Sequence, residues 1–403
     1  MKIASRIAWI AAVLLVFALG ITLRTVPYNA FHGVGFDETL YQQYTTQLLE
    51  RGLGGYPSIV HDYMEYQKTL PGSILPPMRF LFIGTAALWS HLSGLEPIRA
   101  LGQVASGFSI LTLVLTFVFM GRAAGRGAAL AVTALMACAP TQIHMGQHAL
   151  VDGFFTFWAL LVLWLLWENL QRPRNPLLLA AYGAGLALMV LTKENAAFVY
   201  VAVLAILVAN RWLRFGTVSG PLLAVTVLGP AVGALGLLAL AGGVDNLVGC
   251  YQLSVSKNFT LEHAIRTGDG PWHRYLVDLL LVSPWVLVLA IGAFFQLDRE
   301  RHRPQLYLAL FIVASYLLMC NIRYGMNLRY ANMWDAPLRL LAYTELCLLA
   351  ERFGLRRRNV WLAVAVTALC IYDLRQYRIL AIDYNRLYEL IPEILLRAQH
   401  IIK

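Results

Sequence analysis

Three acidic residues have the chemistry of proton transfer at positions where helices are expected to begin. Asp37 and Glu38 are adjacent at the start of a helical pattern that ends at Gly52, and Asp152 opens a long apolar stretch. A carboxylate held in a fixed direction acts as a general base, and a neighbouring carboxylate orients it. Acids at helix starts also serve as caps and favour the helix dipole, so both interpretations stay open here.

Two further segments place charged residues at the ends of apolar stretches. Lys193 and Glu194 stand between two such stretches, where a simple turn needs fewer polar groups. Arg329 and Tyr330 precede another stretch, and a guanidinium presents a planar fork of donors that suits phosphate. These four residues are candidates for substrate binding. The alternative is that the charged side chains snorkel to headgroups or pair with nearby acids.

The loop before residue 80 contains a weaker signal of the same kind. Lys68 and Arg79 lie on either side of Pro76 and Pro77. Their charge is suited to a lipid phosphate, or to anchoring a helix at the headgroups.

Metal binding is not assigned to any side chain. His144 and His148 have the i, i+4 spacing of metal ligands, but no set of carboxylates or thiols lies near them in the sequence. The five cysteines form no CxxC or Cys/His pattern. No cofactor is indicated, and the sequence leaves a requirement for a divalent metal open.

The elements that must position these residues are membrane helices. Of the 403 residues, 59% are apolar and 13% are charged, whereas soluble domains have roughly 45–50% and about 25%. The apolar residues form blocks of spanning length without low-complexity linkers between them. The net charge of +10 is spread over the short loops between blocks, which argues against nucleic acid as a partner and for membrane lipids.

We expect an all-α fold with about eleven transmembrane helices. The first apolar run lacks a clear cleavage site and is expected to remain as an uncleaved helix. The expected spans are 7–24, 100–120, 127–144, 151–168, 177–193, 196–210, 217–241, 276–296, 305–321, 336–352 and 359–372. A further stretch, 78–93, follows two prolines and is interpreted as a re-entrant or juxtamembrane helix.

The basic loops decide this interpretation. If 78–93 does not span, all the arginine clusters lie on the same side as Lys2 and Arg6, as the positive-inside rule expects of short cytoplasmic loops. The clusters lie at 122–126, 172–174, 211–214, 299–303 and 356–358. The outer loop 25–98, Asp152, the loop 242–275 and the segment 323–335 are then outside.

The chain is expected to form one catalytic membrane domain over residues 1–372. The segment 373–403 follows as a tail whose amphipathic pattern predicts a lid packed on that domain.

Several short motifs resemble the GT-C superfamily of polytopic glycosyltransferases, in their order along the chain. The resemblance is closest to the branch of protein O-mannosyltransferases and lipid A aminoarabinose transferases. Asp37-Glu38 resembles the acidic motif after the first span, and Asp152 resembles an aspartate at the outer mouth of a helix. The other matching pieces are Leu75-Pro76-Pro77-Met78 with Arg99, Gly183 and Gly185 with Thr192-Lys193, Ser283-Pro284-Trp285, and Arg329-Tyr330 with Pro337.

Two departures from the family are visible. Leu75 occupies the place of a basic residue before the proline pair, with Lys68 or Arg79 as substitutes for its charge. The chain also lacks the large soluble outer domain of some relatives, so the acceptor does not follow by analogy.

The resemblance implies an inverting transfer of sugar from a polyprenyl-phosphate-linked donor to a hydroxyl of a glycan, lipid or protein acceptor. Asp37 would be the base, Glu38 and Asp152 would orient substrates, and Arg329 and Lys193 would lie near the phosphate. The short single-domain chain with few cysteines favours a bacterial inner membrane, with the site facing the periplasm or exterior. A transporter or flippase of lipid-linked sugars, and a non-catalytic binder of polyprenyl-phosphate lipids, are the alternatives.

Overall fold

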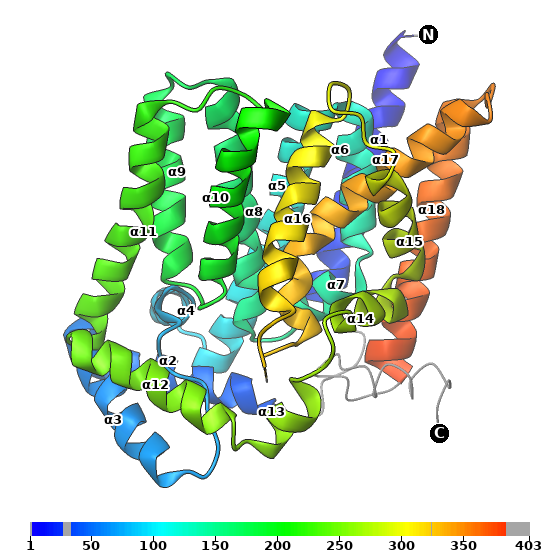
Figure 1. Ribbon diagram of the computed structural model, residues 1–403. Coiled ribbons are helices and arrows are strands. Elements are labelled where there is room, and N and C mark those ends of the chain that lie inside the picture. The colour runs from blue at the N-terminus through cyan, green and yellow to red at the C-terminus, as the bar shows by residue number, and fades with distance from the viewer. Residues whose placement is uncertain (1, 27–33, 324, 384–403) are drawn as a thin grey trace.

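The computed structural model describes residues 2–26, 34–323 and 325–383 of the chain (Figure 1). All regular structure in these residues is helical, and no strand occurs among them. In a bilayer core, backbone groups must be satisfied within the protein, and a helix does so within one segment. The all-α class expected from the apolar blocks is confirmed.

Five described helices are long and apolar enough to cross a membrane. They are α1 (Lys2–Thr25), α5 (Pro97–Ala124), α8 (Val151–Gln171), α10 (Ala196–Leu213) and α11 (Gly220–Ala241). Shorter apolar helices are α4 (Phe80–Ser93), α9 (Pro176–Val190), α15 (Pro284–Phe294) and α16 (Arg303–Met319). The last two long helices, α17 (Asp335–Arg352) and α18 (Arg358–Tyr377), contain buried charges. The expected count of eleven spans is not confirmed.

Two of the expected spans are broken by proline. The stretch expected at 127–144 forms α6 (Arg126–Ala137) and α7 (Pro140–Gln147), which meet at an angle of 58°. The stretch expected at 276–296 divides into α14 (Arg274–Val282) and α15 at Ser283. Proline removes a backbone donor and clashes with the preceding turn of the helix. A hydropathy average over each stretch gives no sign of this break.

Buried arginines satisfy the carbonyl groups that the first break leaves free. Arg24 donates to the carbonyl oxygens of Met136 at 3.0 Å and Ala137 at 3.1 Å. Arg339 donates to that of Leu135 at 3.0 Å. The last carbonyls of a helix have no partner within it, so these contacts let α6 end inside the protein.

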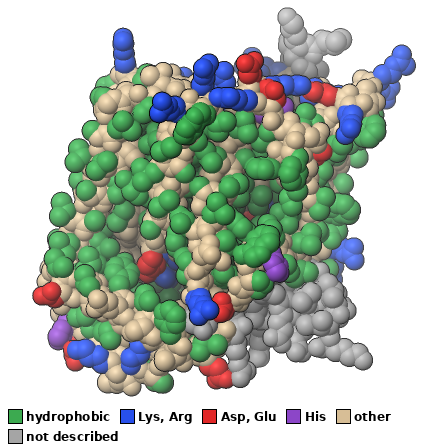
Figure 2. Space-filling view, in the orientation of Figure 1, with side chains coloured by type: hydrophobic (Ala, Val, Ile, Leu, Met, Phe, Trp, Pro, Cys, Tyr) green, Lys and Arg blue, Asp and Glu red, His purple; other side chains and the backbone are tan. Residues whose placement is uncertain are grey.

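Apolar side chains cover the outside of the long helices (Figure 2). On α1, Leu14 and Leu15 are exposed, and on α11 Val227 and Leu235 are exposed. Such contiguous apolar surface is rare on soluble proteins and suits contact with lipid chains.

Short helices gather at one end of the molecule. They are α2 (Phe36–Arg51), η1 (Leu53–Gly55), α3 (Tyr56–Thr69), α12 (Val244–Asn258) and α13 (Glu262–Thr267) (Figure 1). Helix α4 is seen end-on in Figure 1, whereas α9, α10 and α16 run along the length of the bundle. That 78–93 does not span stays a prediction, with which this orientation is compatible.

The opposite end holds the N-terminus and the turns that join α8 to α9, α10 to α11, α15 to α16, and α17 to α18 (Figure 1). The arginine clusters of the sequence lie in these turns and in the α5–α6 turn. Figure 2 shows basic side chains along this end. The expected grouping of the basic loops with the N-terminus is therefore present in the fold.

The apolar core has two main parts. The larger fills the space between α5, α6, α8, α10, α16 and α17, with Leu163, Leu166 and Phe311 at its centre. The smaller joins α2, α3 and α4 to α5 and α8. Its rings include Phe82 and Phe108, both in contact with Phe154. This second part fixes the helices that follow the first span against the start of α8.

The C-terminal boundary differs from the expected one. Helix α18 continues through Asp373 to Tyr377, and a π-helical turn, η3 (Arg378–Asp383), follows. The sequence predicts that the last span ends at 372 and that an amphipathic tail begins at Asp373. Asp373 is instead buried, with its carboxylate 2.9 Å from Arg339. The predicted lid lies mostly in 384–403, outside the described residues.

Candidate active site

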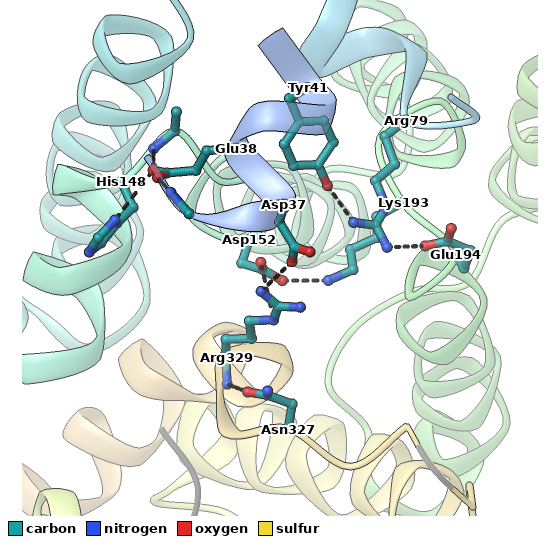
Figure 3. A network of polar contacts seen from close by, with 12 residues as sticks. Asp37, Glu38, Tyr41, Arg79, His148, Asp152, Lys193, Glu194, Asn327 and Arg329 are labelled. Atoms are coloured by element: carbon teal, nitrogen blue, oxygen red, sulfur yellow. Dashed lines mark hydrogen bonds and ion pairs between the residues drawn. The ribbon is translucent and has the colours of Figure 1, made fainter. Parts of the chain in front are cut away.

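The first pair of acids lies at the start of α2, and its two members face different partners (Figure 3). The Glu38 carboxylate accepts hydrogen bonds from the backbone N–H groups of Gly35 at 2.8 Å and Ala149 at 2.6 Å. His148 Nδ1 lies 3.3 Å from the same carboxylate. Glu38 therefore ties α2 to the turn between α7 and α8. Asp37 points away from this turn, into the cluster described next.

Asp152 and Lys193 form a buried ion pair at the centre of the cluster. Asp152 lies in the first turn of α8, where the helix dipole favours a negative charge. The Lys193 ammonium, in the turn between α9 and α10, donates to Asp152 Oδ1. Each residue is 3% exposed, so the pair is shielded from solvent on all described sides.

Arg329 joins this pair to Asp37. It lies in η2 (Leu328–Trp334), a 3₁₀-helix whose start is capped by the Asn327 side chain, which accepts from the Arg329 N–H at 3.0 Å. Its guanidinium donates to Asp37 Oδ2 at 2.7 Å, and its Nε lies 3.9 Å from Asp152 Oδ2. The two aspartates, 115 positions apart in sequence, therefore share one cation.

Arg79 and Glu194 form the next part of the cluster. Arg79 is buried and donates to Glu194 Oε2 at 3.3 Å and to the Tyr41 hydroxyl. Glu194 follows Lys193 in the α9–α10 turn and is partly exposed. The backbone N–H of Leu81 donates to the carbonyl of Leu191 at 2.8 Å, which joins the start of α4 to this turn.

Tyrosine hydroxyls hold the extended segment that leads to Arg79. Tyr63 donates to the carbonyl of Ile74 at 3.2 Å, Tyr44 to that of Leu75 at 2.7 Å, and Tyr56 to that of Pro77. The three tyrosines come from α2 and α3 and are buried. Because this segment contains two prolines and lies outside any helix, its buried carbonyls need such donors. The tyrosines thus fix where Arg79 enters the cluster.

The Tyr330 ring faces two of the cations. The Lys193 ammonium lies 3.8 Å from the ring centroid, and the Arg329 guanidinium carbon lies 5.5 Å from it. Cations within about 6 Å of an aromatic face are attracted to its π-electrons. The Tyr330 ring therefore stabilises the positions of Lys193 and Arg329 without cancelling their charge.

Burial and neighbouring charges shift the pKa values of three groups outside the spans. Burial lowers the pKa of Lys193 to about 8, although Asp152 opposes this shift. Burial would raise the pKa of Glu194, but Arg79 and Lys193 outweigh it and hold the pKa below its usual range. Burial also opposes ionisation of Glu38, and the contacts with His148, Gly35 and Ala149 lower its pKa overall.

Comparison with known proteins identifies the architecture. The family model for dolichyl-phosphate-mannose-protein mannosyltransferase matches residues 97–243. A search of curated proteins found no match. Among solved structures, ArnT from Cupriavidus metallidurans in the apo state matches with a TM-score of 0.56 and 16% identity, over 99% of this chain and 75% of that chain.

Two other solved structures agree. ArnT bound to undecaprenyl phosphate matches with a TM-score of 0.57 and 15% identity, over 99% of this chain and 75% of that one. The apo oligosaccharyltransferase of Archaeoglobus fulgidus matches with a TM-score of 0.62 and 14% identity, over 95% of this chain and 56% of that one. The chain has the GT-C fold.

The resemblance drawn from the sequence motifs is confirmed at the level of the GT-C fold. The matched segment 97–243 runs from α5 to α11 and contains Asp152, Lys193 and Glu194. Asp37, Arg79 and Arg329 lie outside it. The present chain spans three quarters of ArnT and about half of the oligosaccharyltransferase.

The GT-C fold brings most of the candidate residues to one place. Figure 3 shows the acids and cations of α2, α8, the α9–α10 turn, the segment before α4 and η2 converging. Lys68 is the exception, because it lies exposed near the end of α3 and pairs with Glu65 at 2.6 Å. Lys68 was expected near Arg79 because only eleven positions separate them. Helix α3 carries it away.

The sequence analysis identifies Tyr330 but not the tyrosines of α2 and α3, nor the contact of His148 with Glu38. Tyr41 lies four residues after Asp37, so the two share a helix face, and that spacing was a usable signal. His148 was noted only for its spacing from His144, and nothing local indicates that it meets Glu38.

The acids of the cluster face cations rather than one another. Within the part of the chain that the structure describes, no group of three or more His, Cys, Asp or Glu side chains could hold a metal ion. The cluster offers two partly exposed carboxylates, Asp37 and Glu194, beside three cations able to bind an anionic group, Arg79, Lys193 and Arg329.

Proposed function

We propose that this protein is an inverting glycosyltransferase that moves a sugar from a polyprenyl-phosphate donor to an acceptor hydroxyl. The observation that carries the proposal is the convergence of Asp37 and Asp152 with Arg79, Lys193 and Arg329 at the end of the bundle. Structures of GT-C proteins bound to undecaprenyl phosphate, and in complex with dolichol-phosphate, support the class of donor.

In the proposed reaction, the acceptor hydroxyl oxygen attacks the anomeric carbon from the side opposite the phosphate. The bond between this carbon and the phosphate oxygen breaks, and its electron pair leaves with polyprenyl phosphate. Asp37 accepts the hydroxyl proton, since it is the more exposed of the two aspartates that share Arg329, with a side chain that is 14% exposed against 3% for Asp152. Attack from the opposite side inverts the anomeric configuration.

The cations stabilise the negative charge that gathers on the departing phosphate. Arg79, Lys193 and Arg329 are balanced by Glu194, Asp152 and Asp37, so the phosphate must compete with a carboxylate for its cation. Arg329 is the cation for which it competes, because Arg329 is shared by two aspartates at 2.7 and 3.9 Å. When Arg329 turns to the phosphate, Asp37 is uncovered and becomes available as the base.

Glu38 acts as a positioning residue in this proposal, and Asp152 as the partner that keeps Lys193 in place. Among the described residues, the polar contacts of the Glu38 carboxylate are to Gly35, Ala149 and His148. These contacts leave it facing away from Asp37 and fix the direction of α2. The sequence suggested a catalytic or orienting role for Glu38, and the orienting role fits this geometry.

The proposed orientation puts the cluster on the exterior side of a bacterial inner membrane. The N-terminus and the basic turns share the other end of the bundle, which the positive-inside rule assigns to the cytoplasm. Polyprenyl-linked sugars suit this side because nucleotide sugars are largely confined to the cytoplasm. The acceptor is proposed to be a glycan, lipid or protein hydroxyl.

The decisive experiment uses the full chain reconstituted in liposomes with polyprenyl-phosphate-linked sugars and a membrane extract as acceptor. Release of free polyprenyl phosphate is measured by mass spectrometry. We expect release from the wild type and a loss of at least about a hundredfold in Asp37→Asn, because general-base catalysis contributes roughly 10²–10⁴-fold.

Asp245→Asn is the matched control, since Asp245 is an exposed acid at the same end of the molecule. It should retain wild-type release. Full activity in Asp37→Asn would remove Asp37 from the mechanism. Donor movement across the bilayer without release of polyprenyl phosphate would indicate a flippase, and binding without either would indicate a lipid-binding protein.

A further inference from the structure

A second group of charged side chains lies at the end of the bundle opposite the Asp37 cluster. A pocket of about 280 Å³ opens between the start of α6, the α15–α16 turn, α17 and the start of α18. Its lining includes three arginines, Arg126, Arg301 and Arg358, and a single acid, Glu351. Figure 2 shows basic side chains gathered along this end.

The acid does not balance the arginines. The Glu351 carboxylate accepts hydrogen bonds from Arg301 at 2.7 and 2.9 Å, and it lies 3.0 Å from Arg358. Arg126 makes no ion pair with any described acid, and its guanidinium lies over the Trp9 ring at 4.5 Å. The pocket therefore keeps an excess of positive charge. An anion is the class of ligand that this charge favours.

Helix starts add to the same preference. Helices α6, α16 and α18 begin at Arg126, Arg303 and Arg358, and none has a side-chain cap. First-turn N–H groups lack acceptors within their helix and point toward an anion placed at its start. Guanidinium groups beside such N–H groups present the donors that phosphate oxygens accept.

The surroundings of the pocket indicate where the phosphate comes from. Phe295 and Phe353, at the ends of α15 and α17, are 80% and 69% exposed. Leu340 and Leu348 form an apolar wall of the pocket itself. Exposed apolar side chains at helix ends beside basic loops indicate where the lipid chains meet the headgroups. A soluble phosphate compound has no need of such an apolar wall.

We propose that this pocket binds the phosphate-bearing headgroup of an anionic membrane lipid. The lipid phosphate contacts Arg126 and Arg358, and the acyl chains of the lipid leave the pocket beside Leu348 and extend into the surrounding bilayer. Because the pocket is at the other end of the bundle from Asp37, this binding is independent of the transfer reaction.

Cys347 gives a direct readout because it lines the pocket. Cys138, Cys250 and Cys320 are buried, so replacing Cys370 by serine leaves Cys347 as the accessible thiol among the cysteines. The full chain with Cys370→Ser, in micelles, is labelled with a maleimide. Labelling rates are compared in phosphatidylcholine, in phosphatidylcholine with phosphatidylglycerol, and in phosphatidylcholine with inorganic pyrophosphate at equal ionic strength.

We expect phosphatidylglycerol to slow labelling of Cys347 several-fold and pyrophosphate to have little effect. Arg126→Gln should raise the amount of phosphatidylglycerol needed for half protection about tenfold, since it removes a charge-assisted hydrogen bond. Arg126 is exposed, so its replacement leaves the fold intact. Arg174→Gln, which removes an exposed arginine in the α8–α9 turn, is the control and should protect like the parent chain.

Three outcomes would overturn the proposal. Equal labelling rates with and without phosphatidylglycerol would show that no lipid enters the pocket. Protection by pyrophosphate alone would show a soluble phosphate ligand instead of a lipid. Equal weakening in Arg174→Gln and Arg126→Gln would show that general surface charge, rather than this pocket, attracts the lipid.

Discussion

Asp37, Asp152 and Glu194 each face a cation, and that pairing determines what a single substitution does. Lys193 is the most constrained of the cations, because it is buried against Asp152 and the Tyr330 ring. Its charge is also the easiest to remove. A lysine pKa is ordinarily about 10.4, whereas burial lowers that of Lys193 to about 8.

Binding of a polyprenyl phosphate should therefore weaken as the pH rises through about 8, where the Lys193 ammonium loses its proton. Stability changes in the other direction. Between about pH 8 and about pH 10 the unfolded chain binds more protons than the folded chain, so the free energy of unfolding increases over this range. Binding of undecaprenyl phosphate to the full chain, measured between about pH 6 and about pH 10, checks the first expectation.

Lys193→Arg provides the sharper version of that test. Arginine stays protonated over the whole range, so the decline near pH 8 should disappear in this variant. Lys68→Arg is the control, because Lys68 is exposed and lies outside the cluster. An unchanged pH profile in Lys193→Arg would mean that another group titrates.

Glu38 offers a second test at the residue scale, since its carboxylate serves only structural partners in the described chain. Glu38→Ala removes the acceptor for Gly35, Ala149 and His148, and each buried donor left unpaired costs about 1–3 kcal/mol. We expect a lower thermal unfolding midpoint and a reduced kcat for transfer. Glu38→Gln keeps one carbonyl acceptor and should lose less of both. If Glu38→Gln instead abolished transfer with an unchanged midpoint, Glu38 would be catalytic rather than positioning.

At the scale of elements, the broken α6–α7 pair is the feature on which the site depends. The bend turns α7 inward, and the α7–α8 turn then presents Ala149 to Glu38 and places Asp152 at the cluster. Arg24 donates to the last two carbonyls of α6, those of Met136 and Ala137, and also to Ser109 at 2.8 Å and to the carbonyl of Gly20 at 3.0 Å. Arg24 is thus the residue that makes the bend stable.

Replacing Arg24 by methionine should expose this dependence. The variant removes the Arg24 donor from the buried carbonyl of Ala137, a cost of about 1–3 kcal/mol, and leaves the carbonyl of Met136 with the backbone N–H of Ala139 at 3.3 Å. We expect a lower thermal unfolding midpoint in detergent and weaker transfer, because α7 and the start of α8 lose their fixed direction. Thr25→Ala is the control, since Thr25 is exposed and bonds only within its own helix. Equal midpoints in the two variants would show that the break does not need Arg24.

The sequence predicts well that the elements are helices, but predicts poorly where those helices bend and which way they run. Apolar runs indicate helices, and the positive-inside rule groups the basic turns correctly at one end. Hydropathy does not predict the breaks at Ala139 and Ser283. A window average is little changed by one proline, whereas that proline interrupts the hydrogen bonds of the helix backbone. The position of Lys68 likewise depends on the direction of α3, which places Lys68 away from the site and which the sequence does not indicate.

The site was predictable where acids and cations stood at expected helix ends, as Asp37, Asp152 and Lys193 do. It was not predictable where a polar residue acts through a distant backbone group. Tyr44 and Tyr56 read as ordinary residues of amphipathic helices, yet their hydroxyls hold the segment before Arg79. Asp373 is predicted to begin the amphipathic tail, yet it lies within α18 and is buried against Arg339. Such pairings depend on tertiary contacts, and local pattern contains no trace of them.

At the scale of the whole molecule, charge is divided between two ends with different chemistry. One end has basic turns and the arginine-lined pocket, and the other has a cluster in which cations and carboxylates are matched (Figures 2 and 3). This division requires that Asp245, in α12, and Arg174, in the α8–α9 turn, lie on opposite sides of the membrane. The proposed donor reaches the cluster only from the side on which Asp245 lies.

Cysteine labelling in intact cells tests this requirement, because Asp245 and Arg174 are both exposed and their replacement disturbs no buried contact. In a chain whose five native cysteines are replaced by serine, Asp245→Cys should react with a membrane-impermeant maleimide, and Arg174→Cys should react only after the membrane is permeabilised. We expect the basic turns to lie on the cytoplasmic side, because short loops rich in arginine and lysine are rarely translocated across the membrane. Labelling of Arg174→Cys alone would show that the orientation is the reverse and that the cluster lies on the cytoplasmic side. Nucleotide sugars are available to an enzyme on that side, so topology would no longer support a polyprenyl-linked donor.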